Sequence, residues 1–277
     1  MKTTTPNIHK LSPQELRNLQ MILLELLTEV DRICRKNNIN YRIVAGTMLG
    51  AVRHGGFIPW DDDADISFLR SEYEQFIQAC KNDLDTTRFY FQDHNHTRGY
   101  RWGFGKLRRK DTLFLRHGQE HMPYEQGVFI DLFPLDYVPD NYLLRCVTNF
   151  QCFLYRKAFW SIVGKHSVRG LERIAYTILN KIPANWLYNH FNKFIKKRNK
   201  KKTQWVRILT YPTPTKDFAY KSKWAYTTEE INFEGVPLYG VKEYDEYMTF
   251  KFGNYMELPP VNERKTHPVS KLKLIKQ

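Results

Sequence analysis

Apolar side chains near the start of the chain recur at steps of three and four positions, which is the spacing of one helical face. They are Leu16, Leu19, Leu23, Leu26, Leu27 and Val30. Ser12 and Pro13 precede them and suit an N-cap and a first helical turn. The pattern therefore predicts a helix from Pro13 to Asn37.

Shorter apolar runs follow, separated by polar and glycine-containing segments. They predict strands at Tyr41–Ala45, Asp61–Leu69, Phe89–Gln92, Tyr100–Arg108, Thr112–Phe114 and Gly127–Phe133. Helical spacing predicts helices at Met48–His54 and Ser71–Cys80, and Gly55-Gly56 suits the end of the first of these. The first half of the chain therefore combines strands with helices.

The middle of the chain has a helical pattern. Tyr142–Val163 is helix-like and rich in aromatic residues, and a second apolar stripe consists of Leu171, Ile174, Ala175, Ile178, Leu179 and Ile182. Pro183 ends that stripe, and a third helix begins near Trp186 and runs into Lys196–Lys202, where six of seven residues are basic. Beyond it we expect a turn at Phe233–Gly235 and a short helix at Glu243–Phe252.

Composition indicates a folded protein: of the 277 residues, 42% are apolar and 15% aromatic. No apolar run approaches the length that spans a bilayer, and the polar start Met1–Lys10 lacks the apolar core of a signal peptide. The four cysteines and nine histidines show no metal-ligand spacing. We therefore expect a cytoplasmic protein with reduced thiols.

Positive charge is concentrated in one segment. The net charge is +14, and Tyr137–Thr210 holds fifteen Lys or Arg against two acids. The rest of the chain is nearly neutral, which suggests a catalytic body carrying one basic module. We predict a catalytic core at residues 1–136, a basic helical module at 137–217, and a C-terminal segment at 218–277 that completes the catalytic domain.

Acidic residues are concentrated in the segment 46–66, which reads GTMLGAVRHGGFIPWDDDADI. If Asp61–Ser67 is extended, Asp61, Asp63 and Asp65 share one face and Asp62 points the other way. Carboxylates so close together repel each other unless a cation lies among them, and hard divalent ions such as Mg²⁺ take such oxygen ligands. The alternative is an acidic turn that closes a hairpin.

A further acid, Asp131, lies inside the apolar strand GVFIDLF. An ionised carboxylate is costly to bury without a partner, so we expect it to share a cation with Asp63 and Asp65. The alternative is that Asp131 caps a neighbouring backbone or pairs with an arginine.

Together these motifs resemble the LicD family of phosphotransferases, within the nucleotidyltransferase-fold superfamily. The resemblance rests on the segment at 46–66, GKLRRKDT at 105–112, VFIDLFPLDYVP at 128–139, and FEGVPLYGVKEYDEYM with YMELPP between 233 and 260. It implies an α+β fold: a nucleotidyltransferase-like mixed β-sheet core flanked by helices, here with a basic helical insertion. One departure is Phe252–Tyr255, FGNY, where relatives usually resemble YGDY.

The resemblance implies roles for particular residues. Asp63, Asp65 and Asp131 are the catalytic acids and would hold Mg²⁺ or Mn²⁺. Gly46 and Thr47 correspond to the Gly-Ser/Thr element, whose backbone amides would bind phosphate. Arg53 and Lys106 are the other two donor-binding candidates and would neutralise the charge of the phosphates.

The reaction implied by the family is transfer of a phosphocholine-type group from a CDP-linked donor to a glycan hydroxyl, with release of CMP. The acceptor would be lipopolysaccharide, capsule or teichoic acid, CDP-choline is the leading donor, and Asp131 could also take the hydroxyl proton. A choline group is bound by aromatic ring faces. The candidates are Trp60, Tyr100, Trp102, Trp224 and Tyr255.

Two other functions are compatible with the chain. The same acids serve nucleotidyltransferases that act on nucleic acids or small molecules, although we find no nucleic-acid-binding module. A catalytically silent glycan-assembly protein is the second, and the intact acids argue against it. We also expect the basic cluster Lys196–Lys202 to bind an anionic membrane surface, which would make the protein peripheral at the inner face of the cell membrane. The alternative is a solvated helix end.

Overall fold

A mixed β-sheet forms the centre of the fold in the computed structural model, which describes residues 8–275. Residues 1–7, part of the polar start considered above, and residues 276–277 lie outside the described part. The neighbouring strands run in the order β1–β2–β6–β4–β3, and β7 and β8 extend β6. Their bounds are β1 Arg42–Ile43, β2 Asp65–Leu69, β3 Phe89–Gln92, β4 Gly105–Arg109, β6 Phe129–Val138, β7 Trp205–Arg207 and β8 Tyr220–Lys221. β2 and β6 are parallel, and the other pairs are antiparallel.

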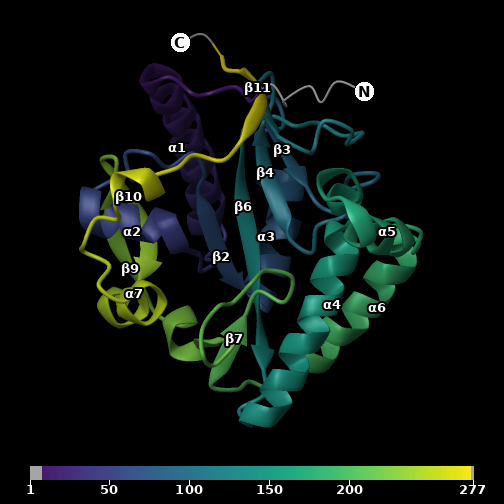
Figure 1. Ribbon diagram of the computed structural model, residues 1–277. Coiled ribbons are helices and arrows are strands. Elements are labelled where there is room, and N and C mark those ends of the chain that lie inside the picture. Colours follow the sequence, from purple (N-terminus) through teal and green to yellow (C-terminus); the bar gives the residue numbers. More distant parts are fainter. Residues whose placement is uncertain (1–7, 276–277) are drawn as a thin grey trace, which may run out of the picture.

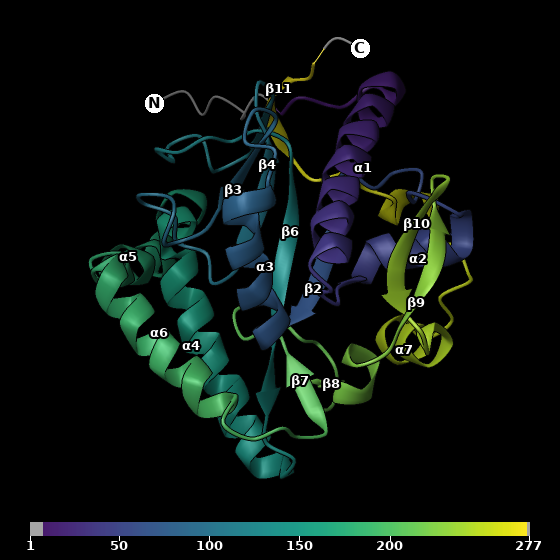
Figure 2. The same ribbon diagram turned by 180° about the vertical axis from the view of Figure 1, so that it is seen from behind.

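Two helices, α1 (Pro13–Lys36) and α3 (Arg70–Asp83), cover one face of this sheet (Figure 2). α1 begins with the predicted capping box, in which Ser12 and Glu15 exchange side-chain and backbone hydrogen bonds. Ile66 and Phe68 are fully buried on this side, and Phe68 stacks on Phe76 of α3. The apolar face of the sheet is therefore sealed by the two helices.

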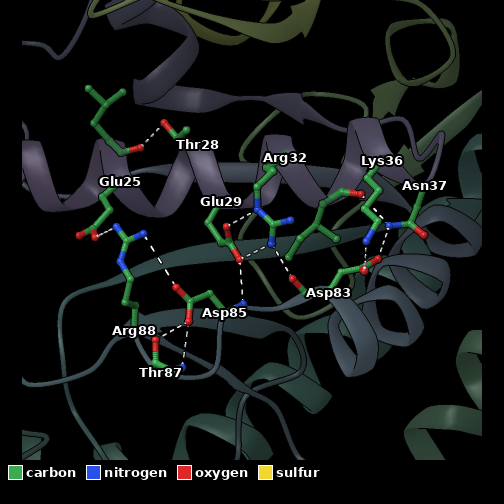
Figure 3. A network of polar contacts seen from close by, with 12 residues as sticks. Glu25, Thr28, Glu29, Arg32, Lys36, Asn37, Asp83, Asp85, Thr87 and Arg88 are labelled. Carbon is green, nitrogen blue, oxygen red and sulfur yellow. Dashed lines mark hydrogen bonds and ion pairs between the residues drawn. The ribbon is translucent and has the colours of Figure 1, made fainter.

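Ion pairs and hydrogen bonds join α1 to the segment that follows α3 (Figure 3). Arg32 donates to Glu29 and to the backbone carbonyl of Asp83, and the Asp83 carboxylate accepts from Lys36 at 2.5 Å. The Glu29 carboxylate also accepts the backbone N–H of Asp85 at 3.1 Å. These contacts lock the two covering helices together, away from the opposite face of the sheet.

The opposite face lies between two groups of elements (Figure 1). On one side are α2 (Ala45–His54), the hairpin of β9 (Thr228–Phe233) and β10 (Val236–Val241), and α7 (Tyr244–Phe252). On the other are α4 (Tyr142–Ser167), α5 (Gly170–Leu179) and α6 (Ala184–Arg198). A separate strand pair joins β5 (Leu113–Arg116) to β11 (Val269–Lys273), and the short 3₁₀ turns are η1 (Ser222–Ala225) and η2 (Val261–Glu263).

The predicted helical middle of the chain is confirmed, and it has its own apolar cluster, which includes Phe159, Leu187 and Phe191. The helical segment follows β6 and precedes β7, and these two strands pair with each other. The chain therefore leaves the sheet and returns to it at neighbouring strands. The predicted division at 136 and 217 stays a prediction, and β6 crosses the first boundary. The C-terminal segment returns to the main core through buried residues such as Phe233 and Met248.

Some predicted strands are shorter in the structure. The strand predicted at 61–69 begins only at Asp65, because residues 61–64 form an irregular connection. The strand predicted at 41–45 keeps Arg42 and Ile43, and Ala45 already begins α2. The strand predicted at 100–108 begins only at Gly105. The mixed sheet flanked by helices is confirmed, and no helix of the described residues is long and apolar enough to cross a membrane.

Candidate active site

Three polar residues stand side by side on the open face of the sheet. Asp65 of β2 is the register partner of Asp131 on β6, and Asp131 is the register partner of Lys106 on β4. The Lys106 ammonium donates to Asp131 Oδ1. Successive side chains of a strand point to opposite faces of the sheet. Ile66 and Leu132, the residues after Asp65 and Asp131, are buried in the core, so the two acids point to the open face. Two of the predicted acids and one predicted donor-binding residue therefore meet.

The connection before β2 brings further carboxylates to the same place. Asp61, Asp63 and Asp65 are partly exposed, whereas Asp62 and Ala64 are buried, as alternation predicted. Burial, followed by repulsion from Asp63, raises the pKa of Asp61 to about 8. Burial also raises the pKa of Asp65 well above its usual range, and the charges of Asp63 and Asp131 add to this effect. The site thus concentrates more negative charge than its own cations balance.

Three cationic side chains border these acids. Burial lowers the pKa of Lys106 to about 8, although the Asp131 carboxylate opposes the shift. Arg116 Nη2 lies 3.7 Å from Asp63 Oδ2, and Lys251 of α7 is close enough to lower the pKa of Asp65 in part. Sequence reasoning missed Arg116 and Lys251, because nothing near them in the chain indicates an acidic partner.

Gly46 and Thr47 lie in the first turn of α2 and contact the start of β2 and the segment before it. The Thr47 hydroxyl accepts the backbone N–H of Asp65 at 2.8 Å. A side chain on Gly46 would place its Cβ 2.9 Å from Asp61 Oδ2, so the close approach of that carboxylate requires glycine. Ala45, the first residue of α2, has a φ of 53°, a strained value for a residue with a side chain. The Gly-Thr element thus positions the acids directly.

Asp62 turns away from this face and anchors the C-terminal segment. It accepts the backbone N–H of His267 at 2.9 Å and lies 2.7 Å from His267 Nδ1. His267 Nδ1 is also 3.5 Å from Asp63 Oδ2, so Asp62, Asp63 and His267 form a group that could hold a metal ion. Of the three predicted metal ligands this group contains Asp63 alone.

A cavity of about 730 Å³ opens beside the acids. Its lining includes the N-terminal residues of α2, Asp61 and Asp65, and the side chains of Arg42, Ser67, Tyr211 and Lys251. Arg42 is 1% exposed, and its Nε and Nη1 have no hydrogen-bond partner among residues 8–275, nor has the buried hydroxyl of Ser67. Arg42 and Ser67 are register partners on β1 and β2. The cavity is therefore lined by unused donors from β1 and from β2, the strand that carries Asp65.

Arg53 lies outside the lining of this cavity. Its guanidinium donates to the backbone carbonyls of Tyr255 at 2.8 Å and Glu257 at 3.1 Å. It thereby connects the end of α2 with the YMELPP motif. Its predicted contact with donor phosphate stays a prediction.

The five aromatic residues proposed for a choline cage do not converge. Trp60 and Trp224 line the cavity, whereas Trp102 lines a different one. Tyr100 is fully buried and donates to the carbonyl of Phe104, and Tyr255 donates to Asp245. Of the five candidates, Trp60 and Trp224 therefore remain available to a ligand in this cavity. Tyr211, which sequence reasoning missed, has its pKa raised by burial and then by Asp65, Asp131 and Asp63, so it faces the acids.

Comparison with known proteins agrees with this arrangement. Residues 38–174 match the family model described as LicD/FKTN/FKRP, nucleotidyltransferase domain. The lipopolysaccharide cholinephosphotransferase LicD of Haemophilus influenzae is 26% identical over 92% of this chain and 96% of its own length. Uncharacterized proteins of Rickettsia typhi and Rickettsia prowazekii are 46% and 48% identical over 20% and 18% of this chain, and 18% and 19% of their own lengths. The matched region contains Gly46-Thr47, Asp63, Asp65 and Asp131. The chain belongs to the LicD family and is a transferase of that family.

Proposed function

We propose that this transferase moves a phosphocholine-type group from a CDP-linked donor to a hydroxyl of a cell-surface glycan and releases CMP. The observation that carries the proposal is the side-by-side placement of Asp65 and Asp131, with Asp65 in the lining of a cavity that also contains Arg42 and Ser67. The match of residues 38–174 to the LicD/FKTN/FKRP family model, and the cholinephosphotransferase activity named for the Haemophilus influenzae relative, support it. CDP-choline is the proposed donor, with CDP-alditols as the alternative.

The cavity suits the nucleotide part of such a donor. Arg42 and Ser67 have unused N–H and O–H groups for the oxygen atoms of the nucleotide. Lys251 and the first amides of α2, at Gly46 and Thr47, add positive potential where a diphosphate would lie. Donor binding would thus place the phosphates between α2 and the acids.

We propose Asp63, Asp65 and Asp131 as the residues that hold Mg²⁺ or Mn²⁺. The oxygen donors fit such an ion. Burial raises the pKa of Asp65, and the neighbouring charges of Asp63 and Asp131 raise it further, so a cation among these acids would stabilise their ionised forms. When bound, the ion would neutralise charge on the phosphate oxygens. His267 with Asp62 and Asp63 is a neighbouring alternative group.

The side chains themselves can supply the proton transfer. Asp131 would accept the proton of the attacking glycan hydroxyl, and Lys106, hydrogen-bonded to Asp131, would keep that carboxylate oriented. Lys106 would also neutralise charge on the transferred phosphate. Arg53 would act on the donor only after release of its contacts to Tyr255 and Glu257, so its present geometry favours an indirect role.

The test is incubation of the purified chain with CDP-choline, CDP-alditols, CTP and ATP, with glycan acceptors and Mg²⁺. Transfer of a phosphocholine-type group releases CMP and leaves no nucleotide on the product. Release of pyrophosphate, with a nucleotide on the product, would show a nucleotidyltransferase instead.

We also propose that one end of the helical module binds an anionic membrane surface. Arg198 donates to Thr148, which places the cluster Lys196–Lys202 beside the first turns of α4. There the apolar side chains of Leu143, Val147 and Phe150 are 72%, 56% and 61% exposed, at helical spacing. An exposed apolar stripe beside clustered lysines is typical of an interfacial helix.

A further inference from the structure

A second cavity, of about 460 Å³, lies between the sheet and the helical module. Its walls are aromatic: Trp102 and Phe104 come from the segment before β4, and Trp160 and Tyr176 come from α4 and α5. Trp160 and Tyr176 meet edge to face with ring centroids 5.1 Å apart. Gly164 allows this approach, because a Cβ there would lie 2.7 Å from both side chains. The cavity is thus enclosed by α4 and α5 together with the segments before β4 and after β7.

The two cavities meet at one place. Tyr211 and Pro212 line both of them, and Tyr211 packs on Phe133, two residues beyond Asp131 on the same face of β6. Phe104, in the second cavity, also contacts Phe133 with centroids 4.6 Å apart. The two cavities are therefore separated by an aromatic partition that lies next to the strand carrying Asp131. Group transfer between two substrates needs such an arrangement, with one substrate on each side of the reacting atoms.

Charges in the second cavity select against a choline group. Arg156 and Lys157 of α4 line it, and no carboxylate of the described residues lies within 4.0 Å of the Arg156 guanidinium. Lys157 donates to the Tyr176 hydroxyl at 2.6 Å and lies 3.6 Å from the half-exposed Glu172. Two cations against one acid disfavour a quaternary ammonium and favour a negatively charged ligand.

A polar group inside the cavity also lacks a partner. Thr210 is 6% exposed, and its hydroxyl makes no hydrogen bond within the described part of the chain. It adjoins Gly103, where a Cβ would lie 2.4 Å from the Thr210 methyl group. A buried hydroxyl without a partner is uncommon and indicates a ligand or water that is hydrogen-bonded there. Flat aromatic faces, a free hydroxyl and a cation together fit a sugar ring with an anionic substituent.

We propose that this second cavity binds the acceptor glycan through a sugar ring that carries a phosphate or carboxylate. The ring stacks on Trp160 and Trp102, the anionic group pairs with Arg156, and Thr210 hydrogen-bonds a ring substituent. This inference rests on the proposed function, because it takes the larger cavity as the donor site. The acceptor hydroxyl then reaches the acids past Tyr211.

Saturation-transfer NMR on the full chain tests the cavity with glucose 6-phosphate, glucuronate and methyl glucoside as probes, and with inorganic phosphate, which has no carbon-bound proton, as a competitor. Glucose 6-phosphate or glucuronate should bind, with contacts to the ring protons. Arg156→Gln and Trp160→Ala should each weaken that binding about tenfold, the effect of losing one charge-assisted or stacking contact. Lys165→Gln, on the same helix but outside the cavity, should leave it unchanged.

CDP titrated into the same variants separates this inference from the proposed function. The Kd of CDP should stay within twofold in Arg156→Gln and Trp160→Ala, and should rise in Trp60→Ala, which alters the larger cavity. Binding of CDP with no binding of either anionic sugar overturns the acceptor site and leaves the donor site intact. Displacement of glucose 6-phosphate by an equal concentration of inorganic phosphate, to the same extent as by unlabelled competitor sugar phosphate, also overturns it, since no ring is then recognised. If Trp160→Ala is unfolded by circular dichroism, Arg156→Gln decides.

Discussion

Asp65 and Asp131 are register partners on the parallel strands β2 and β6, and both side chains point to the open face of the sheet. The backbone N–H of Asp65 is in turn held by the Thr47 hydroxyl at 2.8 Å. Two acids far apart in the chain are thus positioned by the sheet itself, and the helix that follows β1 supports the first of them. Such rigidity is what a catalytic pair requires.

We expect Asp63→Asn, Asp65→Asn and Asp131→Asn to abolish turnover of the donor. Loss of one ligand to a catalytic metal should cost at least about 10²–10³-fold, as loss of one transition-state hydrogen bond does. EDTA should also abolish turnover, and Mg²⁺ or Mn²⁺ should restore it. CMP release measures this, with the exposed Glu74→Gln as a control. Normal turnover of the wild type in metal-free buffer would refute the metal assignment.

The pH dependence of stability should report the same carboxylates. The pKa of Asp61 in the folded chain is about 8, against about 3.9 when unfolded. Between these values the folded state binds more protons than the unfolded state, so stability should fall as pH rises from about 4 to about 8. Mg²⁺ should offset the loss at high pH. Tm in EDTA should therefore decrease with pH more steeply for the wild type than for Asp61→Asn, and equal slopes would contradict the shift.

Arg42 should determine donor affinity. Its guanidinium is buried beside Ser67, with two nitrogen atoms unpaired. Arg42→Lys keeps the positive charge but loses the planar fork, so we expect the Kd of CDP to rise about tenfold, with a milder effect for Ser67→Ala. Isothermal titration measures both. Because Arg42 also pairs with Glu72 at 3.2 Å, a fall in Tm without a change in Kd would assign it to stability alone.

Arg53 should behave differently from Arg42. In Arg53→Ala the two backbone carbonyls of Tyr255 and Glu257 lose their donor. We expect Tm to fall, with the Kd of CDP nearly unchanged. Arg53→Lys retains a donor and should recover part of the Tm. A large loss of CDP affinity at unchanged Tm would instead support direct contact with phosphate.

Local patterns predicted the acids of this site well but not their surroundings. Alternation predicted that Asp62 points away from Asp63. Asp62 is buried, but residues 61–64 precede the strand, and both carboxylates contact His267. His267, the partner of Asp62, comes from a segment far along the chain and carries no local signal. The same holds for Tyr211 and Lys251, which reach the site only through tertiary packing.

The apolar stripe after Gly170 shows a second limit. Its periodicity correctly predicted α5, yet Leu171, Ile174 and Ile178 are 84%, 57% and 61% exposed. Helical spacing indicates an amphipathic helix but does not say what covers its apolar face. The helix instead packs on α4 through Tyr176.

The membrane prediction concerns the end of the molecule formed by α6 and the first turns of α4. Each lysine near an anionic surface contributes about 1 kcal/mol, so Lys200, Lys201 and Lys202 together should contribute several. We expect the triple Gln variant of these lysines to bind anionic vesicles much more weakly in a flotation assay. The matched control changes Lys242, Lys271 and Lys273, which are exposed but lie outside α4–α6. Arg198 is left in place, because it donates to Thr148 and holds the helices together.

Electrostatic and apolar contributions to this binding can be separated. Raised salt should release the wild type in part, because it screens the lysines but not the apolar contact. Phe150→Ser should weaken binding at every salt concentration, because it removes apolar surface that would be buried in the membrane. The Phe150 ring is 61% exposed, so its replacement should have little effect on the fold. CMP release with a short soluble acceptor should survive all these changes, because the lysines and Phe150 lie outside both cavities. If the wild type does not bind anionic vesicles at low salt, the basic cluster has no membrane role and serves only as a solvated helix end.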